Sequence, residues 1–326
     1  MHARSDTSPP RENHRVVFGL QLALGALGLI GAGAAVAAAA SSVHHDARAA
    51  HDVVVLGAHF TYPAVNVAAV VLLMLAALGL TVIVTAALAG WRQLRAYRHF
   101  VAGMRLVGPL RGHPGVTIIE DATPQAFCAG FLRPRVYVSA GALELLSVDE
   151  LGAVLLHEEH HRGTRDPLRL ACARVLNQAL FFLPALRPLS DRYSELAEQR
   201  ADAAAIEGAA GAKAPLASAL LAFEAGAPAG SAGISPERVD TLLGVAPRKQ
   251  LPTTLIVASV AALAVLIVLV WRASALASAD ATFNLPLLSS QPCMLVLALL
   301  PVIACVGSIA GRRVFRPGGV SQQIAT

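Results

Sequence analysis

The sequence predicts a helical membrane protein in which four transmembrane helices flank an inserted, mainly α domain that also contains strands (α+β). Of its 326 residues, 55% are apolar and only 14% are charged, a composition that is unusual for water-soluble domains. Long uncharged segments lie towards both ends of the chain, whereas most charged residues lie between them. We therefore expect the apolar segments in a lipid bilayer and the central part in water.

The first pair of membrane helices is expected at residues 16–40 and 64–89, which form a hairpin over 16–90 after an N-terminal tail at 1–15. Neither helix contains a charged residue. At ~1.5 Å per residue the first extends roughly 37 Å, enough to cross a hydrocarbon layer of ~30 Å. Its alanine-rich end also resembles a cleavable signal peptide. Both alternatives put residue 41 outside.

Arginines predict which side of the membrane the central domain occupies. Five of them follow the second helix: Arg92, Arg95, Arg98, Arg105 and Arg111. Such clusters mark the cytoplasmic side. A second hairpin over 251–311, with spans at 253–271 and 293–311, leads to a basic tail at 312–326. Both termini and the central domain, 91–250, are thus expected in the cytoplasm of a multi-pass cell-membrane protein.

Within the central domain, residues 116–120 and 135–139 are rich in β-branched and aromatic residues and predict strands. A helix is expected to begin at Val148, because Ser147 and Glu150 form a capping-box pattern, and to stop at Gly163. Further helices are expected at 168–183, within a core or on the membrane surface, and at 191–208. No run of basic residues alternates with aromatic ones, so nucleic acid is not an expected partner.

The helix that begins at Val148 carries the pattern most informative about function. His157-Glu158-Glu159-His160-His161 matches H-E-x-x-H, in which two histidines four residues apart share one helical face and can bind a single Zn²⁺. Glu158 directly follows the first histidine, the position of a general base. His160 is a rival ligand, but choosing it would break the spacing of the motif.

Zinc needs a third protein ligand, and a face of three acids supplies candidates: Glu195, Glu198 and Asp202. Glu198 is the best third ligand, and Asp202 is suited to hold the other ring nitrogen of a ligand histidine. Zinc would acidify a water molecule, and Glu158 would accept its proton during attack on a peptide carbonyl. Candidate donors for the resulting oxyanion are Tyr193, Arg200 and Arg238.

These motifs resemble those of the integral-membrane gluzincin proteases, which include the BlaR/MecR-type antirepressor peptidases, the HtpX-type proteases and the CAAX prenyl proteases. The resemblance covers roughly residues 92–245, and Glu198-Gln-Arg-Ala-Asp202 matches the E-x-x-x-D element of that family. It implies a zincin-like metalloprotease domain with one zinc ion per chain and Glu198 as a ligand. It also matches Asp166 to a recurrent acid, for which the sequence alone suggests a helix cap.

The same resemblance implies that a strand near Ala126 and Phe127 pairs with an extended protein or peptide substrate. Cys128 is then a packing residue beside the cleft. Among the subgroups, the smaller relatives of the BlaR/MecR type fit best and suggest a cytoplasmic repressor or a membrane protein as substrate. Quality control of the HtpX type comes next, and the CAAX role last.

A second hypothesis comes from a different functional class. Four histidines lie between the first two helices: His44, His45, His51 and His59. They either form a solvated polar loop or sense metal or pH. In the second case the chain would be a non-catalytic membrane receptor or scaffold, and its zinc site would be structural.

Overall fold

The computed structural model describes residues 14–42, 50–55, 58–63, 67–209, 212–226 and 251–280. Three of its helices are long and apolar enough to cross a membrane, namely α1 (His14–Ser42), α2 (Val67–Gly103) and α9 (Thr253–Asp280). They coincide with three of the four expected spans and indicate association with a membrane. The fourth expected span, 293–311, lies outside the described residues, and so does the expected C-terminal tail.

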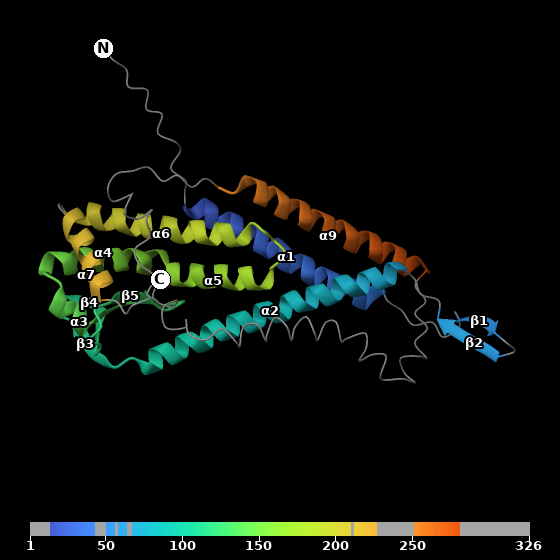
Figure 1. Cartoon of the computed structure of the whole chain (residues 1–326), viewed down its shortest axis with the longest axis horizontal. Helices are drawn as coiled ribbons and strands as arrows, with labels where there is room; N and C mark the ends of the chain where they lie inside the picture. Colours follow the sequence, from blue (N-terminus) through green and yellow to red (C-terminus); the bar gives the residue numbers. More distant parts are fainter. Residues whose placement is uncertain are drawn as a thin grey trace, which may run out of the picture.

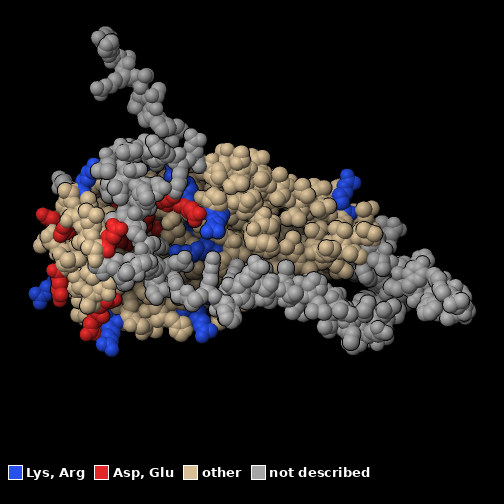
Figure 2. Space-filling view, in the orientation of Figure 1, with Lys and Arg blue, Asp and Glu red and all other residues tan. Residues whose placement is uncertain are grey.

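The membrane helices and the mixed domain lie at opposite ends of the elongated molecule (Figure 1). Helices α1, α2 and α9 run along the long axis, and a small sheet lies with further helices at the other end. In the view of Figure 2, charged side chains gather over that second end. Towards the opposite end, where the apolar parts of the long helices lie, the visible described surface is almost free of charge apart from a basic side chain near the tip. This separation agrees with the apolar and polar parts of the sequence.

Helix α2 is longer than the span expected within it. The predicted span ends at Ala89, but the helix continues to Gly103, because residues 91–103 contain no proline and several good helix formers. Its last turns pack on the sheet, where the Phe100 and Phe127 rings lie 5.4 Å apart. One continuous helix thus connects the apolar end of the molecule to the mixed domain.

A pair of strands replaces the histidine-containing loop expected between α1 and α2. Strands β1 (Ala50–Val55) and β2 (Ala58–Pro63) pair antiparallel, with His51 opposite Tyr62. The three consecutive valines of β1 explain its extended conformation. The side chains of the four histidines lie outside the described part of the chain, so the sensing hypothesis gains no support here.

The mixed domain contains a four-stranded sheet with the order β3-β4-β6-β5. Its strands are β3 (Leu106–Leu110), β4 (His113–Ile119), β5 (Ala126–Ala129) and β6 (Arg135–Ser139). Strands β4 and β6, the two expected from the sequence, are parallel and central. Strand β5 forms an edge beside α4, and the turn to β6 begins at Gly130, whose φ of 118° disfavours other residues.

After the short helix α3 (Ala140–Leu145), helix α4 (Val148–Thr164) begins where the capping box predicted. Ser147 accepts a hydrogen bond from the Glu150 amide at 3.4 Å, and the Glu150 carboxylate accepts one from the Ser147 amide at 2.8 Å. The predicted stop at Gly163 is wrong. Gly163 is helical, and Arg165 adopts the left-handed conformation instead, with φ 57° and ψ 39°.

Helices α5 (Asp166–Ala179) and α6 (Leu186–Gly208) form a hairpin, followed by α7 (Lys213–Gly226). Helix α5 ends earlier than residue 183. Its end belongs to a core cluster, because Leu176 and Leu180 pack on Gly25 and Gly28 of α1. Polar contacts hold the tip: the Gln21 amide donates to the Leu186 carbonyl at 3.4 Å. The hairpin therefore extends alongside the apolar helices.

The crossing of α1 and α2 gives a test of this packing. A Cβ atom on Gly79 would lie 2.5 Å from the backbone oxygen of Ala32, whereas one on Gly90, also in α2, would meet nothing within 4 Å. We expect Gly79→Ala to destabilise the protein by about 1–3 kcal/mol through overpacking. Gly90→Ala should be neutral or stabilising, by up to about 1 kcal/mol. Thermal unfolding in detergent measures both, and an unchanged melting temperature for Gly79→Ala would contradict the crossing.

Candidate metal centre

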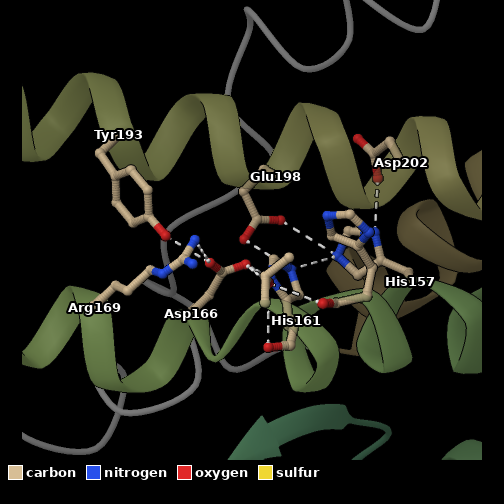
Figure 3. A network of polar contacts seen from close by, with 9 residues as sticks. His157, His161, Asp166, Arg169, Tyr193, Glu198 and Asp202 are labelled. Carbon is tan, nitrogen blue, oxygen red and sulfur yellow. Dashed lines mark hydrogen bonds and ion pairs between the residues drawn. The ribbon is translucent and has the colours of Figure 1, made fainter. Parts of the chain in front are cut away.

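Helices α4 and α6 pack against each other in an antiparallel arrangement, and the site lies between them (Figure 3). Residues four apart on a helix share a face, so His157 and His161 both point from α4 towards α6. Glu198 and Asp202, also four apart, point back from α6. Because the helices are antiparallel, His157 lies next to Asp202, and His161 lies towards the start of α6.

Three side chains converge at the centre of this interface. The Nε2 atoms of His157 and His161 are 3.2 Å apart. Each lies 3.5 Å from an oxygen of the Glu198 carboxylate. Among the described residues, these three form the group of histidine and carboxylate side chains that could hold a metal ion, with ligand atoms within 4.8 Å of one another. His160, the rival ligand, does not belong to the group.

Each histidine has its own carboxylate on the other ring nitrogen. Asp202 Oδ1 lies 2.9 Å from His157 Nδ1, and Asp166 Oδ2 lies 2.8 Å from His161 Nδ1. A carboxylate in this position favours a hydrogen on Nδ1 and leaves the Nε2 lone pair available to a metal. The structure thus brings Asp202 to the position expected of it and places Asp166 in the same role beside His161, and both carboxylates are almost fully buried.

The spacing of the two histidines fits zinc. Ligand atoms ~2.0–2.1 Å from a tetrahedral zinc ion lie about 3.3 Å apart, and the two Nε2 atoms are 3.2 Å apart. The Glu198 carboxylate turns one oxygen to each histidine, Oε2 to His157 and Oε1 to His161, each at 3.5 Å. The donor set of two imidazoles and one carboxylate is also one that catalytic zinc sites use.

The connection between α4 and α5 places Asp166. Left-handed Arg165 reverses the chain at a cost of about 1–2 kcal/mol for a residue other than glycine. As a result Asp166 starts α5 close to His161, and it is not the helix cap that the sequence suggested. Its carboxylate accepts hydrogen bonds from Thr164 Oγ1 at 2.7 Å and from the Tyr193 hydroxyl at 2.6 Å. No motif in the sequence marks Thr164 as a site residue, although its place two residues before Asp166 suits such a bond.

These contacts set the charge of the metal-free site. Burial alone would lower the pKa of His157, but the contacts with Asp202 and Glu198 outweigh burial and raise it to about 9. The pKa of His161 is raised in the same way, mainly by Asp166, against the opposite effect of burial. Burial would raise the pKa of Asp166, but hydrogen bonds from His161, Thr164 and Tyr193 hold it below its usual value. Both pKa values are therefore shifted in the direction that favours the protonated imidazole, and for His157 the shift is large.

A cavity opens over the metal-binding group and is bordered by the edge strand. Glu158 lines it together with both histidines and Glu198. Of the two strand residues singled out from the sequence, Ala126 lines the cavity, whereas the Phe127 side chain is buried on the opposite face against Phe100. Cys128 also lines it, and burial raises the pKa of its thiol to about 12, so this thiol is protonated at neutral pH.

The candidate oxyanion donors are not gathered at this cavity. Tyr193 is fully buried and donates its hydroxyl hydrogen to Asp166, which makes it a support for His161 (Figure 3). Arg200 is exposed on α6 and does not line the cavity. Arg238 lies outside the described residues. In this arrangement neither Tyr193 nor Arg200 is placed to stabilise an oxyanion.

Comparison with known families gives an independent result for part of the chain. Residues 99–191 match the model of peptidase family M48. The matched segment includes the sheet and α4 with its H-E-x-x-H motif, and it ends before Glu198 and Asp202. No curated protein matches the chain. The match makes this part of the chain similar to a family of metallopeptidases, and the apolar helices indicate association with a membrane.

The raised pKa of His157 predicts how zinc affinity depends on pH. Zinc requires the neutral imidazole, so binding below about pH 9 must displace a proton. When only the proton on His157 is considered, the apparent affinity for zinc should fall about tenfold for each pH unit as the pH is lowered from 9 to 7. Competition with a chelator at several pH values measures the slope, and a flat profile would contradict the protonation of His157.

A pair of variants tests the cause of that slope. Asp202→Asn removes the carboxylate beside His157, so we expect about 10–100-fold weaker zinc binding at high pH and a shallower loss towards pH 7. Glu207→Gln, on the exposed part of the same helix, should keep the wild-type profile. If both variants gave identical profiles, Asp202 would have no role in positioning His157.

Proposed function

We propose that this chain is a zinc-dependent endopeptidase anchored in the membrane, in which His157, His161 and Glu198 bind the zinc ion. The observation that carries the proposal is the convergence of these three side chains, whose ligand atoms lie within 4.8 Å of one another, with Glu158 on the wall of the same cavity. The match of residues 99–191 to peptidase family M48 supports the same class of reaction.

The residues of the chain divide the chemistry among them. When bound, zinc would polarise the scissile carbonyl and lower the pKa of a water molecule. Glu158 would accept the proton of that water and later deliver it to the leaving amine. Asp202 and Asp166 would hold the histidines in the orientation that the metal needs, and Tyr193 would fix Asp166.

The substrate would bind as an extended segment along β5. This strand is an edge of its sheet, so one row of its backbone groups is available for pairing with another chain. Backbone pairing recognises peptides with little dependence on sequence. We propose proteins in the cytoplasm or in the membrane as substrates. The family match gives no support to a repressor in particular.

We also propose that the mixed domain faces the cytoplasm. Arg92, Arg95 and Arg98 follow the apolar part of α2 within its last turns, and basic residues next to a span favour the cytoplasmic side. No observation on the described residues favours the receptor or scaffold hypothesis. A closed structural zinc site would also have no use for Glu158 on the cavity wall.

The role of Glu158 can be tested against its neighbour. Glu158→Gln should lower cleavage of casein in detergent by about 10²–10⁴-fold, because the general base is lost, while the zinc content stays unchanged. Glu159 lies on the exposed side of α4 and pairs with Arg162. Glu159→Gln should therefore retain nearly full activity. Chelator-sensitive cleavage by Glu158→Gln at the wild-type rate would overturn the proposed role.

Sidedness is tested separately. A reporter that works only in the cytoplasm should be active when it is fused after Gln250. A reporter that works only outside the cell should be inactive at the same position. A matching fusion within residues 43–49, between α1 and α2, should report the opposite side. Activity of the Gln250 fusion outside the cell would reverse the orientation without affecting the zinc site.

A further inference from the structure

The cavity over the metal-binding group continues past it along α5 towards the apolar helices. On α5 it is lined by Pro167, Leu170 and Arg174, and on α2 by Gln93 and Tyr97. Among the described residues that line this cavity, Arg174 is the one lysine or arginine. The acids Glu158, Asp166 and Glu198 lie at the metal-binding group, so positive charge and negative charge occupy different parts of the cavity.

Arg174 lies level with the boundary between the apolar and polar parts of the molecule. Leu176, two residues further along α5, packs on Gly25 within the first candidate span. On the facing wall, Gln93 stands between Arg92 and Arg95, just after the uncharged segment of α2 ends. A charged side chain at such a depth is energetically unfavourable next to lipid, and it usually lines a water-filled cavity or contacts a substrate.

The distance from the metal-binding group sets which part of a substrate would reach Arg174. Asp166, which contacts His161, and Arg174 are eight residues apart on one helix, about 12 Å at 1.5 Å per residue. Long side chains on a helix point towards its N-terminus, so the Arg174 guanidinium is expected closer to the metal-binding group than the Arg174 Cα atom is. An extended peptide advances ~3.3 Å per residue. The guanidinium is therefore about two to four residues from the bond to be cleaved.

We infer that Arg174 selects substrates that carry a carboxylate about two to four residues from the cleaved bond, on the side nearest the membrane. This inference rests on the proposed peptidase function and adds a substrate preference to it. A guanidinium binds a carboxylate through two parallel hydrogen bonds. The carboxylate comes either from an aspartate or glutamate side chain or from the terminus of the substrate chain.

The test uses the full chain, loaded with zinc in detergent, and a set of peptides that differ at one position. Glu, Gln or Lys is placed in turn at each position two to four residues on either side of the cleaved bond. We expect the wild type to prefer Glu to Gln at one of these positions, about 10–100-fold in kcat/KM. Peptides that end there with a free or an amidated terminus show which source of carboxylate is used.

Charge reversal separates recognition from folding. With Arg174→Gln, the kcat/KM values for the Glu and Gln peptides should differ by no more than about twofold. With Arg174→Glu, the Lys peptide should have the highest kcat/KM. Arg111→Glu, at an exposed turn outside the cavity, should keep the wild-type preference. A purely structural role for Arg174 would lower cleavage of all peptides by the same factor, and that result would overturn the inference.

The outcomes also distinguish this inference from the function on which it rests. Chelator-sensitive cleavage of every peptide at equal rates by the wild type would leave the peptidase function in place and overturn the selection by Arg174. Failure of the zinc-loaded wild type to cleave casein or any peptide would overturn the peptidase function itself, and the inference with it.

Discussion

The antiparallel contact between α4 and α6 is the constraint on which the site depends. It sets His157 and His161 opposite Glu198 and Asp202 (Figure 3), so that two pairs of residues from distant parts of the sequence meet in one layer. The carboxylates raise the pKa of both histidines against the opposite effect of burial. The contact between the two helices is therefore supported by charge, and the same side chains form the group that could hold a metal ion.

The α5–α6 hairpin connects the site to the apolar part of the molecule. Asp166 stands at the start of α5 and Tyr193 lies on α6, and the tip beyond them is packed on α1 by Leu176 and Leu180. The Ala185 amide at the same tip donates to Ser259 of α9 at 3.1 Å. The side chains that contact His161 therefore belong to a unit that is packed among the apolar helices. The position of those helices and the geometry of the site are linked through rigid packing.

Helix α2 supplies the opposite wall. Its apolar part lies with α1 and α9, and its last turns cover one face of the sheet while Gln93 and Tyr97 line the cavity. A peptide on the edge strand would therefore lie between α2 and α5, next to the level at which the molecule changes from apolar to polar. This location favours substrate segments close to a membrane surface. It also gives a charged side chain such as Arg174 a place where partial exclusion of water strengthens its interactions.

The sequence by itself determined the local features. Charge-free segments defined three described membrane helices, the capping box fixed the start of α4, and H-E-x-x-H spacing put two histidines on one face, because each depends on neighbours within a few residues. The tertiary structure decided what lies far apart in the chain. Left-handed Arg165 and the hairpin beyond it moved Asp166 from a helix cap to a partner of His161. Burial turned Tyr193 from a candidate oxyanion donor into the support of that carboxylate. Strand β5 became an edge through the order of the strands in the sheet. Arg174 came to line the cavity through the packing of α2, α4 and α5, which periodicity along one helix cannot reveal.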